Sequence, residues 1–93
     1  MAVLSDEEIE SGLAGLEGDW ARKGDAIERQ LEAKDFRGSV DLVNRITDVA
    51  EEMNHHPDLA ISWNKVTLSL STHSQGGITD SDLELARRID ELA

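Results

Sequence analysis

All three histidines of this chain lie at the two ends of one segment, Asn54 to His73. His55 and His56 stand near its start, directly before Pro57, and His73 closes it. Imidazole titrates near neutral pH, so it can give or take a proton in catalysis, and its neutral form can bind a metal ion. These positions raise the question of whether the two ends of the segment meet to form a site.

The residues between the histidines alternate between apolar and polar in two runs, which is typical of the two strands of a β-hairpin. We expect the turn at Asn64-Lys65, because a slip of one residue from this register would place apolar side chains opposite polar ones. The register continues outward to place His56 opposite His73 at the open end of the hairpin. The apolar pairs that it predicts are Leu59 with Leu70, Ile61 with Leu68, and Trp63 with Val66.

A long helix is expected to end just before the first two histidines. Asp35 can cap its start, and Pro57 prevents its continuation. Glu51 lies one helical turn before His55 on the same face, so its carboxylate and the helix C-terminus should favour the imidazolium form of His55. The sequence thus predicts a cluster of three histidines with a carboxylate attached. The apolar stripe of this helix is expected to consist of Phe36, Val40, Val43, Ile46, Ala50 and Met53.

The remaining elements flank this unit. Ser5 and Glu8 form a capping box for a short helix that should end near Gly18. A turn signal around Gly24 precedes a strand that alternates from Ile27 onward, and the residues around Trp20 are expected to pair with it as a hairpin. Thr79 can cap the last helix. The predicted order is helix, strand, strand, helix, strand, strand, helix, an α+β domain over residues 1–93.

The composition narrows the possible functions. The chain has 93 residues, no cysteine, and a formal net charge of −11 from 20 acidic and 9 basic residues. Disulfides and thiolate chemistry are excluded, and the negative charge disfavours direct binding to nucleic acid. The start resembles no signal peptide and no segment is long enough to cross a membrane, so we expect a soluble, cytoplasmic protein. A domain this small often covers apolar surface by forming oligomers.

Each candidate site residue also has a simpler interpretation. A histidine is often a surface or structural residue, and Glu51 could be an ordinary solvated side chain. Asp82 follows Thr79 at the spacing of a capping-box partner, and Trp20 is by default a core or interface residue. The more specific alternative to an acid–base site is a metal site, since neutral His and Glu are good zinc or iron ligands. Against it, the adjacent His55 and His56 tend to point in different directions.

The joined pattern closely resembles the pterin-4a-carbinolamine dehydratases. Their E-x-x-x-HHP segment matches Glu51 to Pro57, the following aromatic-Asn-x-Val matches Trp63 to Val66, and Leu-x-Thr-His matches Leu70 to His73. The resemblance extends from about Trp20 to Leu92. Asn54 stands where the family often has Asp, which concerns pH optimum and pterin preference rather than the reaction.

The resemblance implies a four-stranded antiparallel sheet with its helices packed on one face, and a homodimer or homotetramer. It also implies a hydro-lyase that converts 4a-hydroxytetrahydropterin to quinonoid dihydropterin and water, recycling the tetrahydropterin cofactor without a metal or redox cofactor. The positions of His55, His56 and His73 match the catalytic histidines of the family. Two carboxylates match supporting positions and one aromatic matches a substrate-binding position, namely Glu51, Asp82 and Trp20.

We expect His73 to act as the base in this reaction, with His55 and His56 handling the leaving hydroxyl and the pterin contacts. Glu51 would orient or charge His55, and Asp82 would either polarise a histidine or only cap the last helix. The alternative to an enzyme is a protein-binding module, because animal members of the family also act as transcriptional coactivators through dimerisation.

Overall fold

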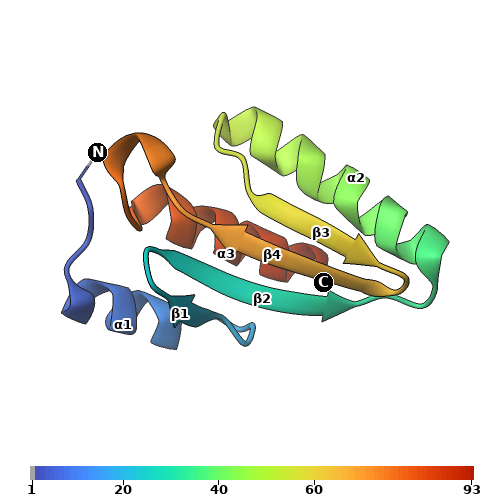
Figure 1. The fold of residues 1–93 in the computed structure, drawn as a ribbon, viewed down its shortest axis with the longest axis horizontal. Helices are drawn as coiled ribbons and strands as arrows, with labels where there is room; N and C mark the ends of the chain where they lie inside the picture. Colours follow the sequence, from blue (N-terminus) through green and yellow to red (C-terminus); the bar gives the residue numbers. More distant parts are fainter. Residues whose placement is uncertain (1) are drawn as a thin grey trace.

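The computed structural model describes residues 2–93 and contains a four-stranded antiparallel sheet in the order β1-β2-β4-β3 (Figure 1). The element order is helix, strand, strand, helix, strand, strand, helix, which confirms the expectation from the sequence. A single turn of 3-10 helix, η1, precedes the last helix. The elements are α1 (Asp6–Ala14), β1 (Ala21–Lys23), β2 (Ala26–Glu32), α2 (Phe36–Met53), β3 (Asp58–Ser62), β4 (Lys65–Leu70), η1 (His73–Gln75) and α3 (Asp80–Leu92).

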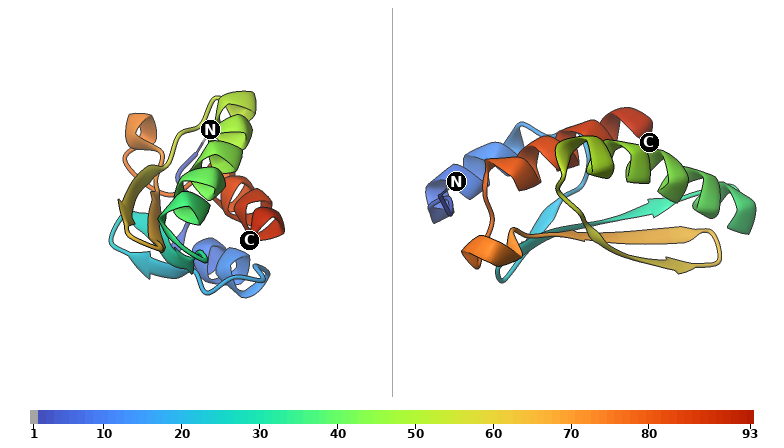
Figure 2. Two further views of the ribbon diagram at one scale, coloured as in Figure 1. Left: turned by 90° about the vertical axis from the view of Figure 1, so that its right-hand side faces the viewer. Right: turned by 90° about the horizontal axis from the view of Figure 1, so that it is seen from above.

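All three α-helices lie on one face of the sheet, as Figure 2 shows from above. The core fills the space between the two layers and includes Ile27 of β2, Leu68 of β4 and Ile46 of α2, all fully buried. Burying apolar side chains between a sheet and a helical layer is the main source of stability in such a fold. The expectation of helices on one face of a four-stranded antiparallel sheet is therefore confirmed.

Caps that the sequence predicted set the helix boundaries. Ser5 and Glu8 form the capping box of α1, and the amide of Ser5 donates to the Glu8 carboxylate, which holds the pKa of Glu8 below its ordinary value. Asp35 caps α2 by accepting from the amide of Gly38 at 2.8 Å. The first helix ends at a Gly15 cap, earlier than the expected end near Gly18.

The apolar stripe of α2 differs in part from the expected one. Ile46 and Ala50 are buried as expected, but the fully buried side chain nearest the start of the helix is Ser39 rather than an apolar residue. Phe36 is 55% exposed, so including it in the core-facing stripe was wrong. It is the first residue of α2, and its side chain is not part of the core cluster formed by the described residues.

The register of the β3–β4 hairpin is two residues away from the expected one. The turn is at Trp63-Asn64, Leu59 pairs with Leu68 and Ile61 pairs with Val66. A slip of two residues keeps every side chain on the same face of the sheet, so alternation could not distinguish the two registers. Hydrogen bonds from Ala33 and Ser39, outside the hairpin, hold this turn. Within the described residues, no helix is long and apolar enough to cross a membrane.

Candidate active site

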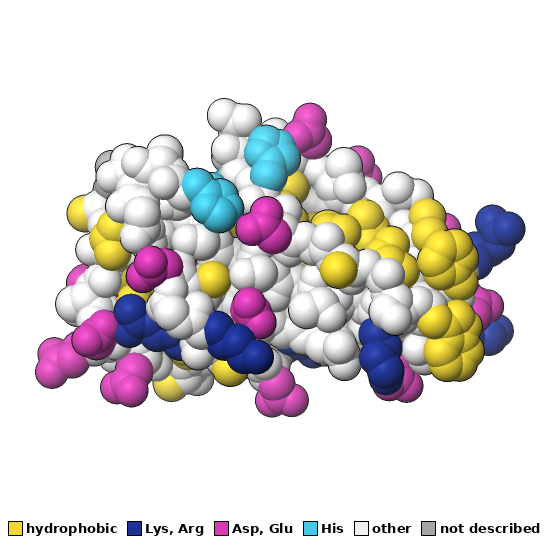
Figure 3. Space-filling model, viewed as in Figure 1, with side chains coloured by type: hydrophobic (Ala, Val, Ile, Leu, Met, Phe, Trp, Pro, Cys, Tyr) yellow, Lys and Arg dark blue, Asp and Glu magenta, His cyan; other side chains and the backbone are white. Residues whose placement is uncertain are grey.

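The three histidines lie at the end of the molecule where α2 leads into β3 and β4 leads into η1. His55 and His56 follow the left-handed C-cap of α2 at Asn54, whose φ is 50°, and His73 begins η1, which is separated from the end of β4 by two residues. Figure 3 shows histidine side chains next to acidic side chains on one face. Each histidine faces a carboxylate, which gives three histidine–carboxylate pairs.

His55 is the least exposed of the three and is joined to the first turn of α3. Its Nε2 lies 2.6 Å from Oδ1 of Asp82, with the His55 side chain 15% exposed and that of Asp82 0% exposed. The left-handed residue Asn54 turns the chain at the helix end, and His55 then points toward α3. This pair therefore joins the C-terminal end of α2 to the N-terminal end of α3.

Asp82 accepts hydrogen bonds from several donors. Its Oδ2 accepts from the amide of Thr79 at 2.9 Å and from the hydroxyl of Thr72 at 2.8 Å, while Oδ1 faces His55. A fully buried carboxylate needs such donors, because burying a charge without partners costs several kcal/mol. The sequence offered two interpretations of Asp82, a capping-box residue or a histidine partner, and the structure places it in both positions at once.

Glu51 contacts a different histidine from the one expected. Its Oε2 lies 2.5 Å from Nε2 of His56, and both side chains are more than half exposed. The expectation that Glu51 would charge or orient His55 placed His55 at the helix end, one turn after Glu51 on the same face. The helix ends at Met53 instead, so His55 leaves the face that carries Glu51 and His56 takes its place beside the carboxylate.

His73 is paired with Asp58, a residue that the sequence analysis did not single out for the site. Its Nε2 lies 3.4 Å from Oδ2 of Asp58, at the start of β3. The predicted cross-strand pairing of His56 with His73 is wrong, because β3 begins at Asp58 and β4 ends at Leu70, before either histidine. The acidic residue directly after Pro57 was the signal that could have indicated this partner.

Trp20 does not lie beside the histidines. It is 7% exposed, and its indole Nε1 donates to Oδ1 of Asp90 at 2.8 Å. Asp90 follows Asp82 by more than two helical turns, about 12 Å along α3. The structure therefore places Trp20 in the core, where its indole is bonded to α3, and its expected contact with substrate stays a prediction.

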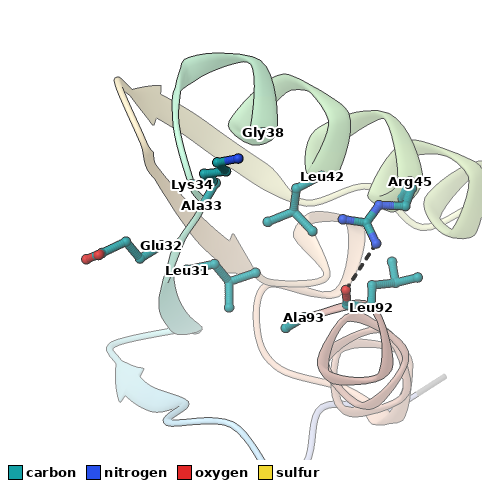
Figure 4. A pocket seen from close by; sticks show the side chains of 9 residues that line it. All are labelled: Leu31, Glu32, Ala33, Lys34, Gly38, Leu42, Arg45, Leu92 and Ala93. Atoms are coloured by element: carbon teal, nitrogen blue, oxygen red, sulfur yellow. Dashed lines mark hydrogen bonds between the residues drawn. The ribbon is translucent and has the colours of Figure 1, made fainter.

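A cavity of about 230 Å³ lies at the other end of α2, away from the histidines (Figure 4). Leu31, Leu42 and Leu92 form its apolar base, and Arg45 spans it by donating to the backbone oxygen of Leu92 at 3.3 Å. No histidine and no residue of the three pairs lines it. We therefore take the candidate site from the histidine–carboxylate pairs and not from this cavity.

The arrangement of the three pairs suits proton transfer. The side chains of His56 and His73 are 57% and 72% exposed, so a small molecule can reach both imidazoles. A carboxylate beside an imidazole fixes its orientation and supports the positive charge that forms when it takes a proton. Within residues 2–93, no group of three His, Asp or Glu side chains is arranged to hold a metal ion.

Comparison with known proteins agrees with the resemblance drawn from the histidine pattern. The model of the family described as pterin 4 alpha carbinolamine dehydratase matches residues 2–92. A protein of Nocardia farcinica named "Putative pterin-4-alpha-carbinolamine dehydratase" is 50% identical over 91 residues, covering 98% of this chain and 95% of its own. A protein of the same name from Thermosynechococcus vestitus is 52% identical over 90 residues, covering 97% of this chain and 94% of its own.

Two solved structures share the fold. The crystal structure of a transcriptional coactivator/pterin dehydratase from Brucella melitensis has a TM-score of 0.92 and 31% identity, covering 98% of both chains. A pterin dehydratase-like protein described as a RuBisCO assembly factor in the alpha-carboxysome has a TM-score of 0.67 at 15% identity, covering 85% of this chain and 92% of its own, and shows a common fold alone. The matched family model and the similar sequences cover nearly the whole chain, and the chain therefore belongs to the pterin 4 alpha carbinolamine dehydratase family.

Proposed function

We propose that this protein is a 4a-hydroxytetrahydropterin dehydratase, which removes water to give quinonoid dihydropterin and thereby recycles tetrahydropterin cofactor. The observation that carries the proposal is the set of three histidine–carboxylate pairs at one end of the sheet. Membership of the pterin 4 alpha carbinolamine dehydratase family supports a dehydration reaction, and the family description supports a pterin as the substrate. We place the reaction in the cytoplasm.

The reaction needs two proton transfers and no redox step. The C4a–O bond breaks as the hydroxyl takes up a proton and leaves as water, and N5 loses its proton to form the new C=N bond. We assign His73 as the base at N5, with His55 and His56 acting on the hydroxyl and holding the pterin. Asp58 and Glu51 would support the imidazolium forms of their partners as protons pass.

Paired variants on α2 test this assignment. Glu51 and its neighbour Glu52 are both exposed glutamates, but Glu51 faces His56 whereas Glu52 pairs with Arg88. We expect Glu51→Gln to lower kcat for dehydration of synthetic carbinolamine and Glu52→Gln to leave it unchanged. Equal rates for the two variants would show that the pair of Glu51 and His56 has no part in the reaction.

A second function, as a protein-binding module, is favoured by one observation. Phe36 and Trp63 are 55% and 67% exposed, and Leu59 of β3 is 38% exposed. Ser39 donates to the backbone oxygen of Trp63 at 2.7 Å, so the turn at Trp63 lies against the first turns of α2, the helix that begins at Phe36. Figure 3 shows hydrophobic side chains gathered at this end of the molecule. An exposed apolar patch of this kind marks a protein contact surface.

We infer that this patch holds together a homodimer or homotetramer, and that the same surface would carry any partner-binding role. Trp63→Ser should shift the assembly toward smaller species in sedimentation velocity, while His73→Ala should leave the assembly unchanged. If His73→Ala retained the biological function and Trp63→Ser lost it, the chain would act as a binding module rather than as an enzyme.

A further inference from the structure

Two buried threonine hydroxyls stand behind the pair of His55 and Asp82. Thr72 is 7% exposed and Thr79 is 0% exposed, and their Oγ1 atoms lie 2.7 Å apart. The loop after β4 brings them together: the amide of Thr72 donates to the backbone oxygen of Gly77 at 2.9 Å, and Gly76 adopts a left-handed φ of 73° that closes the loop. Residues from two ends of this loop thus meet at one carboxylate.

The hydrogens of this network can be assigned from the acceptor. A carboxylate oxygen only accepts, so the Thr72 hydroxyl donates its single hydrogen to Oδ2 of Asp82. The hydrogen between the two threonines must then come from Thr79, whose oxygen accepts from the amide of Ser81. The chain of donors therefore runs from α3 through both threonines to Asp82, and each hydroxyl has a fixed direction.

The same reasoning shows which ring nitrogen of His55 carries the hydrogen. Oδ1 of Asp82 accepts, so the Nε2 of His55 carries the hydrogen. Its Nδ1 has no bonding partner within residues 2–93, and the only buried side-chain N or O atom without a partner there is Oδ1 of Asn64. The Nδ1 of His55 therefore reaches solvent and is the nitrogen that can meet a bound molecule.

We infer that Thr72 and Thr79 are positioning residues that hold Asp82 so that His55 keeps its hydrogen on Nε2 and presents Nδ1 to the substrate. The catalytic relevance of this inference rests on the proposed dehydratase function. A helix cap alone would need only Thr79 and Asp82, which already form a capping box. Thr72 lies outside the helix and still donates to the same carboxylate. Its hydrogen bond is therefore not needed to cap α3 and instead helps to hold the Asp82 carboxylate in place.

The nitrogen assignment can be tested without an activity assay. Long-range nitrogen–proton NMR spectra of the labelled full chain, recorded where His55 is neutral, distinguish a protonated ring nitrogen from an unprotonated one. We expect Nε2 of His55 to carry the hydrogen in the wild-type protein. Thr72→Val should introduce a measurable fraction of the Nδ1–H form, because Oδ2 loses a donor and the carboxylate can turn away. Hydrogen on Nδ1 in the wild-type protein would overturn the inference even if no variant folded.

The kinetic test uses matched threonine variants. Thr72→Val should lower kcat for dehydration about tenfold with KM little changed, since a misplaced catalytic group loses rate more than binding. Thr72→Ser keeps the hydroxyl and should restore both rate and tautomer. Thr67→Val removes a hydroxyl of β4 that accepts from Gln30, outside the Asp82 network, and should change neither.

The outcomes separate the two proposals. If Thr72→Val keeps the wild-type tautomer and kcat, or if Thr72→Ser fails to restore them, the threonines only stabilise the fold and the inference is wrong. A wild-type protein without dehydratase activity would refute the proposed function, and the NMR spectra of the wild type and Thr72→Val would then decide the positioning of His55 alone.

Discussion

Replacing Asp82 by Ala should destabilise this protein far more than replacing any exposed acidic residue of α3. The change removes the acceptor of three groups at once: the Thr79 amide, the Thr72 hydroxyl and the His55 ring nitrogen. Asp80 lies in the same first helical turn but is exposed, so Asp80→Ala is the matched control. Both variants remove one carboxylate near the positive end of the helix.

The loss of unfolding free energy follows from the buried donors that Asp82→Ala leaves without an acceptor. A buried donor without an acceptor costs about 1–3 kcal/mol, and the Thr79 amide and the Thr72 hydroxyl both become such donors. Together these two donors account for about 2–6 kcal/mol. We therefore expect Asp82→Ala to lower the free energy of unfolding by about 3–5 kcal/mol. Asp80→Ala should lose only the interaction with the helix dipole, about 0.3–1 kcal/mol.

Urea unfolding followed by circular dichroism measures this difference at a fixed protein concentration, which matters if copies associate. In a domain of this size each kcal/mol corresponds to about 4–8 °C in melting temperature, so the two variants should differ by about 8 °C or more. If Asp82→Ala and Asp80→Ala lost the same amount within 1 kcal/mol, Asp82 would not be the buried acceptor described above.

Three further variants test the packing that supports the site. Ile46→Ala, at a fully buried position of α2, should cost about 2–5 kcal/mol of unfolding free energy in the same urea experiment, and a cost below 1 kcal/mol would contradict its place in the core. Gly18→Ala should cost about 1–3 kcal/mol, because an added Cβ would clash with the side chains of Arg29 and Asp90, whereas Gly15→Ala has room and should be near neutral. Trp20→Phe should cost about 1–2 kcal/mol through loss of the bond to Asp90, read from the shift in urea midpoint, and an unchanged midpoint would show that this bond adds nothing.

Local chemistry in the sequence accounts for most of the fold. Capping residues at the start of each α-helix were predictable because a side-chain oxygen there satisfies free backbone amides, and all three caps are present. The alternation from Ile27 to Leu31 identified β2, whose two apolar side chains are buried. These signals are local, so a single sequence carries them.

The position of the turn between β3 and β4 depends on hydrogen bonds to residues far away in the sequence. The amide of Ala33 donates to the backbone oxygen of Asn64 at 2.6 Å, the Asn64 side chain donates back to Ala33, and Ser39 bonds the oxygen of Trp63. These bonds hold the turn at Trp63-Asn64 and keep Trp63 at a φ of 52°. No local pattern encodes them, which is why the register was wrong by two residues.

The partners of the histidines were harder to predict than the histidines themselves. Three histidines at the ends of one segment were visible in the sequence, but which carboxylate each one faces depends on where α2 ends and on how η1 turns. Asn54 redirects His55 toward Asp82, and the end of β4 brings His73 to Asp58. The sequence pointed to Glu51 and Asp82 as acidic residues of the site but not to Asp58. Which histidine each carboxylate faces depends on the folded structure.

Dehydratase activity itself is tested by the rate at which purified wild-type protein dehydrates 4a-hydroxytetrahydropterin, followed by stopped-flow absorbance against buffer alone. Histidine acid–base catalysis should accelerate the reaction by about 10²–10⁴-fold. His73→Ala, folded as judged by circular dichroism, should lose most of that acceleration. A wild-type protein that dehydrates the carbinolamine no faster than buffer would contradict the proposal that these histidines form a dehydratase site.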